Sequence, residues 1–241
     1  MLEPTDVRAW LFDLDGVITP TAEIHEHAWS ELFNTFLDEH HDGDEHEPFT
    51  ARSYLDHVDG KPRLDGVRDF LASRGIELPE GGEDDEAGAH TVHGLGNAKN
   101  DAFLGVLRRD GIAGYDASVA FLDDLAGRDG VRIACVTSSR NGPEVLDAAG
   151  LRDRFEVLVD GNVRAEEGLR GKPAPDTYLL AAERLGVPAA EAAVVEDATS
   201  GVAAGRAGDF GLVVGVDRGA GEAGLREHGA DVVVTDLTEL R

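Results

Sequence analysis

Cysteine is nearly absent from this sequence of 241 residues, in which Cys135 is the single example. A disulfide within the chain is therefore impossible, and the apolar run around Cys135 predicts a buried thiol rather than a reactive one. The start of the sequence has no basic flank followed by a long apolar stretch, which argues against a signal peptide. No run approaches the length of a membrane-spanning helix. We therefore expect a cytoplasmic protein.

Basic residues are also scarce. Lysine and arginine total 22 against 48 acidic residues, which gives a formal net charge of −26. A negative field of this size repels nucleic acids and anionic membranes, so we expect neither as a partner. An anionic substrate would need a basic pocket within this field. Hydrophobic residues make up 41% of the chain, which is enough for a buried core and argues against global disorder.

Short apolar runs typical of buried strands alternate with helical patterns along most of the chain. The runs predict strands at residues 7–12, 131–136, 155–159, 193–195, 211–216 and 231–234. The intervening patterns predict helices at residues 117–126, 143–149, 175–185 and 200–207. Such alternation predicts an α/β fold with a parallel sheet covered by helices on both faces.

The first strand is separated from the others by a long segment without strand patterns. This segment carries helical patterns at residues 21–37, 64–71 and 98–107 and an acidic, exposed loop at residues 79–88. We therefore predict a doubly wound parallel-sheet core formed by residues 1–19 and 111–241. An all-helical cap domain, residues 20–110, is inserted into it.

The first strand ends on two carboxylates, Asp13 and Asp15, and Gly16 then lets the chain turn. In a doubly wound sheet, ligands bind at the carboxyl ends of the strands. Two carboxylates at such an end can share one hard cation and still leave one of them to attack a substrate. An acidic strand end in an acidic protein is the alternative without function.

Three further segments place polar residues after apolar runs. Thr137 opens a stretch of hydroxyls and backbone N–H groups before a helix, which suits a phosphate and also suits an ordinary helix N-cap. Lys172 stands in a rigid turn between a glycine and a proline, an unusual setting for a solvated charge. Glu196 and Asp197 close a later strand. This set suits phosphoryl transfer through an aspartyl-phosphate, with magnesium neutralising charge.

The order of these motifs and their shared position after strands resemble the haloacid dehalogenase (HAD) superfamily. Within it, the chain is similar to the β-phosphoglucomutase-like subfamily, which has a Rossmann-like core and a helical cap after the first motif. The resemblance covers nearly the whole chain. It implies these catalytic residues: Asp13 as nucleophile, Asp15 as general acid/base, Thr137 as hydroxyl group and Lys172 as cation. It implies a Mg²⁺ ion held by Asp13, the backbone carbonyl of Asp15 and Asp197, with Glu196 close by.

The same resemblance implies substrate-binding residues in the cap and the core. They are Thr21 and His25 at the hinge, Arg63 and Lys99 in the cap, and Ser139, Arg140 and Asn141 for the phosphate that is not transferred. The sequence departs from the subfamily pattern at Pro20, where an acidic residue is common, and at Gly66, where a serine is typical. The region at residues 79–92 is also longer and more acidic than is usual for this cap. These departures weaken any assignment of one particular sugar phosphate.

Two activities remain open at this point. The first is isomerisation of a sugar 1-phosphate to a sugar 6-phosphate, and the second is hydrolysis of a sugar phosphate. Asp15 favours phosphate chemistry over dehalogenation, because a carbon–halogen bond breaks without a proton donor. A signalling receiver domain needs neither Asp15 nor the insertion, and an inactive binding protein would not need the complete set of motifs. We expect a small phosphorylated sugar as the substrate and a monomer as the active form.

Overall fold

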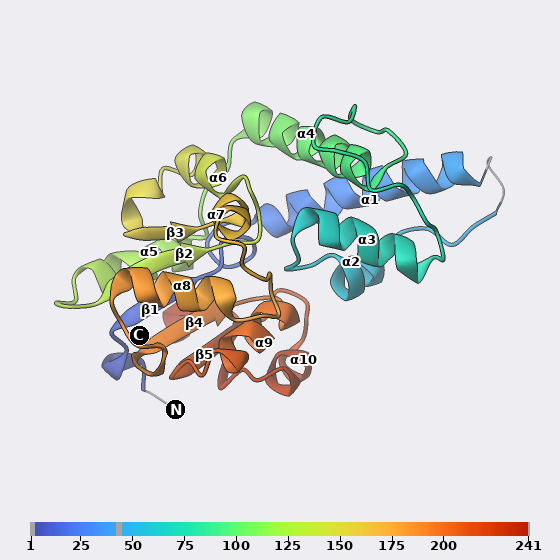
Figure 1. Cartoon of the computed structure of the whole chain (residues 1–241). Coiled ribbons are helices and arrows are strands. Elements are labelled where there is room, and N and C mark those ends of the chain that lie inside the picture. The colour runs from blue at the N-terminus through green and yellow to red at the C-terminus, as the bar shows by residue number, and fades with distance from the viewer. Residues whose placement is uncertain (1–2, 42–44, 241) are drawn as a thin grey trace. The chain divides into compact units, whose positions relative to one another are not determined.

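The structure is a computed structural model that describes residues 3–41 and 45–240. Its contacts divide the chain into two compact units (Figure 1). The core unit comprises Met1–Thr21 and Ile112–Arg241, and the helical unit comprises Ala22–Gly111. Each unit has its own hydrophobic cluster. Among the described residues, no helix combines the length and the apolarity needed to cross a membrane.

The core unit is built on a parallel sheet of six strands in the order β3-β2-β1-β4-β5-β6. The strands are β1 (Ala9–Phe12), β2 (Arg132–Val136), β3 (Val157–Val159), β4 (Ala192–Glu196), β5 (Leu212–Val216) and β6 (Val232–Val234). The first strand therefore lies in the middle, with the chain winding outward to both sides. This order confirms the predicted doubly wound α/β fold.

Strand β1 is buried on both faces, which explains its continuous apolar sequence. Trp10 and Phe12 contact the ring of Phe121 on one face. Leu11 points to the other face, where it shares a cluster with Tyr178. Helices thus cover both faces of the sheet, as predicted. They are α5 (Asp116–Ala126), α6 (Gly142–Ala148), α7 (Gly161–Glu166), α8 (Asp176–Leu185), α9 (Thr199–Ala207) and α10 (Glu222–Glu227). The 3₁₀ turns are Pro4–Asp6, Arg152–Arg154, Ala189–Glu191 and Leu237–Leu240.

The helical unit contains α-helices and no strand in its described part. The helices are α1 (Thr21–His40), α2 (Ala51–His57), α3 (Arg63–Ser73) and α4 (Val92–Asp110). Helix α2 was not predicted, although Thr50 and Ser53 form a capping box at its start. Helix α4 begins well before the predicted residue 98, because the Thr91 side chain accepts the Gly94 N–H and caps the helix there.

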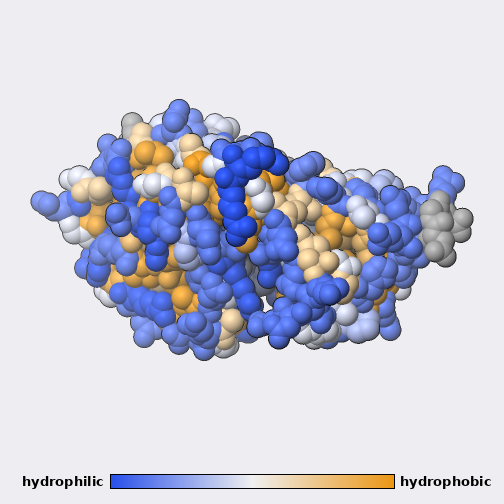
Figure 2. Space-filling model, turned by 90° about the horizontal axis from the view of Figure 1, so that it is seen from above, coloured by the Kyte–Doolittle hydropathy of each residue, from blue (hydrophilic) through white to orange (hydrophobic). Residues whose placement is uncertain are grey.

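The acidic connection between α3 and α4 is an exposed loop, as its composition predicts. It is nevertheless held to α4, because the Asn97 side-chain amide donates to the carbonyls of Glu83 and Asp85 at 3.1 and 3.0 Å. Figure 2 shows that hydrophilic residues dominate the visible surface, in keeping with the large net charge.

Candidate active site

The predicted motif residues of the core unit gather at one edge of the sheet. Asp13 follows β1, Thr137 follows β2, and Glu196 ends β4 with Asp197 directly after it. All strands are parallel, so their carboxyl ends share one edge, and β1 lies between β2 and β4. The Asp13 N–H continues the ladder by donating to the Val195 carbonyl at 2.9 Å. The topology therefore brings these side chains together around the end of β1.

Lys172 comes from the connection between α7 and α8 and is buried in the same place. Its ammonium group donates to the Asp13 carboxylate, to Glu196 Oε1 at 2.5 Å and to the Val136 carbonyl at 3.3 Å. Burial by itself would lower the pKa of Lys172, but the carboxylates of Asp13 and Glu196 hold that pKa above its usual value. Lys172 is therefore a permanent cation between two acids.

Lys172 does not fully compensate the negative charge around Asp13. Burial raises the pKa of Asp13 well above its usual value, and the negative charges of Glu196 and Asp15 raise it further against the opposing effect of Lys172. The site thus carries more negative charge than Lys172 balances. A further cation close to Asp13 would favour its ionised form.

Asp15 is held by two threonines of the core unit. Thr21 donates its hydroxyl to Asp15 Oδ1, and Thr137 donates to Asp15 Oδ2 at 3.3 Å. The Thr21 hydroxyl also lies 2.9 Å from that of Thr19. Thr21, predicted as a substrate contact, is fully buried, and its hydroxyl contacts Asp15 and Thr19 in this structure.

Asp197 lies against the turn that follows Asp15. Gly16 has φ +81°, and a Cβ atom at this position would lie only 1.8 Å from Asp197 Oδ2. One carboxylate oxygen from each of Asp13, Glu196 and Asp197 lies within 4.8 Å of the others, and all three residues are buried. Such a set of oxygen donors with excess negative charge fits a hard divalent cation such as Mg²⁺.

Glu196, within this acidic group, is bound by several groups of the protein. Its Oε1 accepts from Lys172 and, at 2.8 Å, from the hydroxyl of Tyr178, while its Oε2 accepts the Ala198 N–H at 3.2 Å. Gly201 makes room for it, since a Cβ there would lie 1.8 Å from Oε1. Glu196 therefore balances the charge of Lys172 together with Asp13, and both of its oxygens already accept hydrogen bonds from the protein.

Sequence reasoning missed Tyr178, which lies in the first turn of α8. Burial raises the pKa of its phenol well above the usual value, and the charge of Glu196 adds to this effect, so the hydroxyl stays a donor. The ring also lies 5.0 Å from the Lys172 ammonium. The sequence did contain one signal for this role, which is an aromatic residue in the helix directly after the Lys172 turn.

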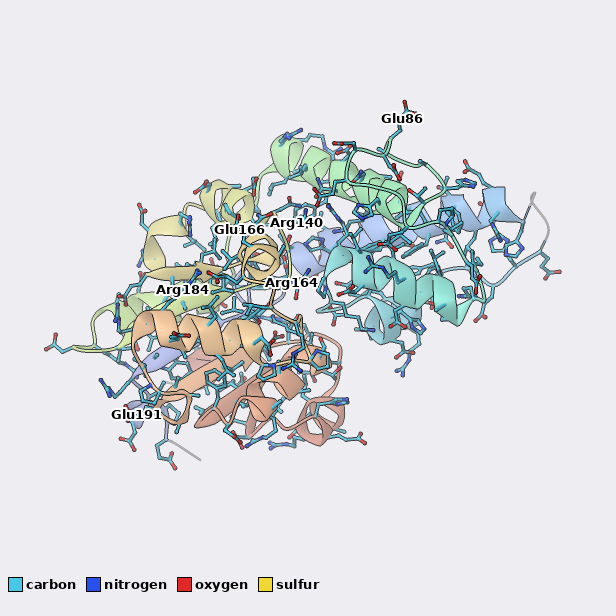
Figure 3. All side chains as sticks on the ribbon, viewed as in Figure 1. Glu86, Arg140, Arg164, Glu166, Arg184 and Glu191 are labelled. Carbon is cyan, nitrogen blue, oxygen red and sulfur yellow. The ribbon has the colours of Figure 1, made fainter. Side chains whose placement is uncertain are left out.

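Ser139, Arg140 and Asn141 form a compact loop between β2 and α6. The Ser139 N–H donates to the Thr137 hydroxyl, and the Asn141 N–H donates to the Ser139 hydroxyl, both at 3.1 Å. The side chain of Asn162 fixes the Arg140 carbonyl at 2.9 Å. Figure 3 shows Arg140 beside α7, with its exposed side chain at the surface. The loop and Asp15 are thus linked through Thr137.

The helical unit brings three of the predicted residues to one region around α4. Buried Lys99 donates to Nδ1 of His25, whose ring stacks on Phe103 with 4.1 Å between centroids. Arg63 opens α3, and a Cβ at Gly96 would lie 3.6 Å from its Nε atom. Gly96 and Lys99 share one face of α4 because they are three residues apart.

Comparison with known proteins defines the class. The model of the haloacid dehalogenase-like hydrolase family matches residues 7–209. With the parallel sheet and the acidic site at its edge, this match shows that the chain belongs to the haloacid dehalogenase-like hydrolases.

Individual relatives indicate which kind of haloacid dehalogenase-like protein this is. The β-phosphoglucomutase of Mycobacterium bovis is 52% identical over 244 residues, covering 98% of this chain and 92% of the relative. The β-phosphoglucomutase of Bacillus subtilis is 31% identical, covering 97% and 92%. A solved β-phosphoglucomutase from Clostridium difficile shares the fold with a TM-score of 0.77 at 23% identity, covering 98% of this chain and 93% of that one. The protein is therefore an enzyme of the phosphomutase or phosphatase type.

The contact between Gly16 and Asp197 predicts the effect of a single methyl group. In Gly16→Ala, the left-handed backbone costs about 1–2 kcal/mol, and the new Cβ displaces Asp197. We expect turnover to fall at least about tenfold, because small displacements in an active site have effects of this order. Gly130→Ala is the matched control, since Gly130 has φ +78° and no atom within 4 Å of a Cβ. It should lose similar stability in urea unfolding but keep its turnover. Equal turnover in the two variants would contradict the prediction.

Proposed function

We propose that this enzyme isomerises a sugar 1-phosphate to a sugar 6-phosphate by Mg²⁺-dependent phosphoryl transfer through an aspartyl-phosphate. The observation that carries the proposal is the 52% identity, over 98% of the chain, to a β-phosphoglucomutase. It is supported by the buried cluster in which Asp13, Lys172 and Asp197 surround the end of β1.

Asp13 is the nucleophile of this mechanism. Its carboxylate oxygen attacks phosphorus, forming the Asp13–phosphate bond while the bond from phosphorus to the sugar oxygen breaks. Asp15 gives its proton to the departing sugar oxygen. Lys172, fixed between Asp13 and Glu196, offsets the repulsion between carboxylate and phosphate. In the return step a sugar hydroxyl attacks the Asp13–phosphate and gives its proton to Asp15, and the Asp13–phosphate bond breaks.

Asp13, the carbonyl of Asp15 and Asp197 would hold the magnesium ion. When bound, it neutralises the negative charge that Asp13 and the phosphate share. The raised pKa of Asp13 supports a role for a cation here, because burial and the neighbouring acids disfavour the ionised carboxylate when no metal ion is bound.

In a mutase the phospho-enzyme transfers its phosphoryl group to a sugar phosphate, which gives a bisphosphate. This bisphosphate then binds in the reverse sense. Phosphate groups that are not being transferred need donors, and we assign this role to Ser139, Arg140, Asn141 and Arg63. His25 and Lys99, in contact in the helical unit, bind the sugar. One chain carries all of these residues, so we propose that the monomer is active.

The alternative function is a sugar-phosphate phosphatase. It is favoured by the family match, because that family is described as hydrolases. In this case water attacks the Asp13–phosphate in place of a sugar hydroxyl.

Product analysis tests the proposal. Purified protein with Mg²⁺ is incubated with a panel of sugar 1-phosphates, with and without a trace of sugar bisphosphate, and the products are identified by NMR. Conversion to a 6-phosphate that the bisphosphate accelerates is the expected result. Release of inorganic phosphate alone, whatever the primer, would replace the mutase with the phosphatase.

Magnesium should also stabilise the folded protein. At a concentration one hundred times its Kd, binding to the native state alone raises the free energy of unfolding by about 2.7 kcal/mol. Asp197→Asn removes a ligand and should shrink this increment, whereas Asp147→Asn, an exposed control of the same charge change, should leave it intact. Urea unfolding in Mg²⁺ and in EDTA measures the increment. An equal increment in Asp197→Asn and the parent protein would contradict the assignment.

A further inference from the structure

Arg218 lies just after β5, on the sheet edge that also carries Asp13. The loop around it is built by Asp217, whose Oδ1 accepts the N–H groups of Gly219 and Gly221 at 3.0 Å each. These glycines have φ of +134° and +81°, values that other residues rarely adopt. The loop therefore holds Arg218 in place although its side chain is exposed.

Arg218 contacts three separate segments of the core unit. Its Nε donates to the Gly16 carbonyl at 3.0 Å, and its Nη1 donates to the Thr235 carbonyl at 3.2 Å. Its guanidinium carbon lies 4.1 Å from the centre of the Tyr115 ring. Only a planar group with several donors can bind two carbonyls and stack on a ring at once, so lysine could not replace it.

The Gly16 carbonyl belongs to the turn that carries Asp15. Successive carbonyls of this turn are all bound: that of Gly16 by Arg218, that of Val17 by the Ser118 hydroxyl at 2.6 Å, and that of Ile18 by the Tyr115 N–H at 2.9 Å. The Gly16 N–H is bound as well, by the Thr19 carbonyl at 2.8 Å. Arg218 thus binds the peptide next to Asp15. It also stacks on the ring of Tyr115, whose N–H binds the Ile18 carbonyl.

We propose that Arg218 is a positioning residue for Asp15. It acts through the Gly16 carbonyl and the Tyr115 ring and keeps the Asp15 carboxyl where its proton reaches the departing sugar oxygen. This inference rests on the proposed function, in which Asp15 is the general acid.

The leaving group distinguishes this role from a general effect on folding. A sugar oxygen is a poor leaving group that needs a proton, whereas the oxygen of an aryl phosphate such as p-nitrophenyl phosphate leaves with little help. A misplaced Asp15 therefore slows the reaction of the sugar phosphate more than the reaction of the aryl phosphate. The ratio of the two kcat/KM values does not depend on how much of the protein is folded.

The test measures this ratio in Arg218→Gln and Tyr115→Leu. We expect kcat/KM for the sugar phosphate to fall about tenfold and that for the aryl phosphate less than about twofold, the size expected from a small displacement of a catalytic group. Tyr115→Phe keeps the ring and should keep the parent ratio. Arg226→Gln is the matched control, because Arg226 pairs with Glu222 on the surface of α10 and contacts none of these groups. It should also keep the parent ratio.

Asp15→Asn separates failure of this inference from failure of the proposed function. If Asp15→Asn changes the ratio and Arg218→Gln does not, Arg218 does not position Asp15 and the general-acid role stands. If Asp15→Asn slows both substrates equally, Asp15 is not the general acid. The proposed mechanism and the role of Arg218 then both fall. A change of ratio in both variants, with both controls unchanged, supports the inference.

Discussion

Asp13→Asn should abolish turnover while the protein stays folded. Asparagine has nearly the same volume but lacks the oxygen that forms the bond to phosphorus, so the covalent step is lost. We expect kcat to fall by at least about 10⁴-fold, in line with the removal of a nucleophile in other covalent enzymes. Burial raises the pKa of Asp13, which means that its charge is unfavourable in the folded protein without metal. The amide removes that charge, so the free energy of unfolding in EDTA should not fall.

The measurement is steady-state turnover with Mg²⁺, together with urea unfolding of both proteins in EDTA. Asp147→Asn is the control, because Asp147 is exposed on α6 and its replacement changes the net charge equally. Acid-quenched parent protein should carry one phosphoryl group on the peptide that contains Asp13. Turnover of Asp13→Asn close to that of the parent would rule out the covalent mechanism.

The sheet and the acidic centre could be predicted because their signals are local. Each strand of a buried parallel sheet is a short apolar run, and Asp13, Thr137 and Asp197 each follow such a run directly. The expectation that Lys172 also follows a strand was wrong, because it lies in the connection between α7 and α8. Once the strands are parallel, the ends of β1, β2 and β4 must share an edge. The meeting of Asp13, Thr137 and Asp197 therefore follows from order along the chain.

The short helices could not be predicted in the same way. Helices α7 and α10 have six residues each, too few to show a helical period. Helix α7 is stabilised at its start by Asp160, whose carboxylate accepts the N–H groups of Asn162 and Val163. The start of α4 was missed because glycines at its beginning obscure the apolar pattern that Thr91 and Val92 open.

Residues that act through distant partners were also missed. Tyr178 reads as an ordinary core aromatic, and only the fold shows that its hydroxyl reaches Glu196. Arg218 lies in a glycine-rich segment after β5, at the same sheet edge as the recognised motifs. Its contact with Gly16 joins residues 202 positions apart, which no local pattern encodes.

Arg63→Ala should separate isomerisation from hydrolysis. In the proposed mutase cycle, the bisphosphate binds in two senses, and in each of them one phosphate lies away from Asp13. Arg63 can bind that phosphate through two parallel N–H donors. Losing charged hydrogen bonds of this kind should lower kcat/KM for isomerisation about 10- to 100-fold. An aryl phosphate has no second phosphate, so its slow hydrolysis should change less than about twofold.

Two matched variants make this comparison specific. Arg63→Lys keeps the charge but not the paired donors, so it should recover only part of the isomerisation. Arg68→Ala removes an arginine from the same helix α3, where Arg68 pairs with Asp65 and Glu80 at the surface, and it should leave both activities unchanged. A sugar bisphosphate should shorten the lag of the parent enzyme and do so less effectively in Arg63→Ala, because the bisphosphate binds through the same arginine. If Arg63→Ala lowers both activities by the same factor, Arg63 does not bind the second phosphate. If the parent protein shows no isomerisation with the primer present, its aspartyl-phosphate passes to water, and the enzyme is a phosphatase.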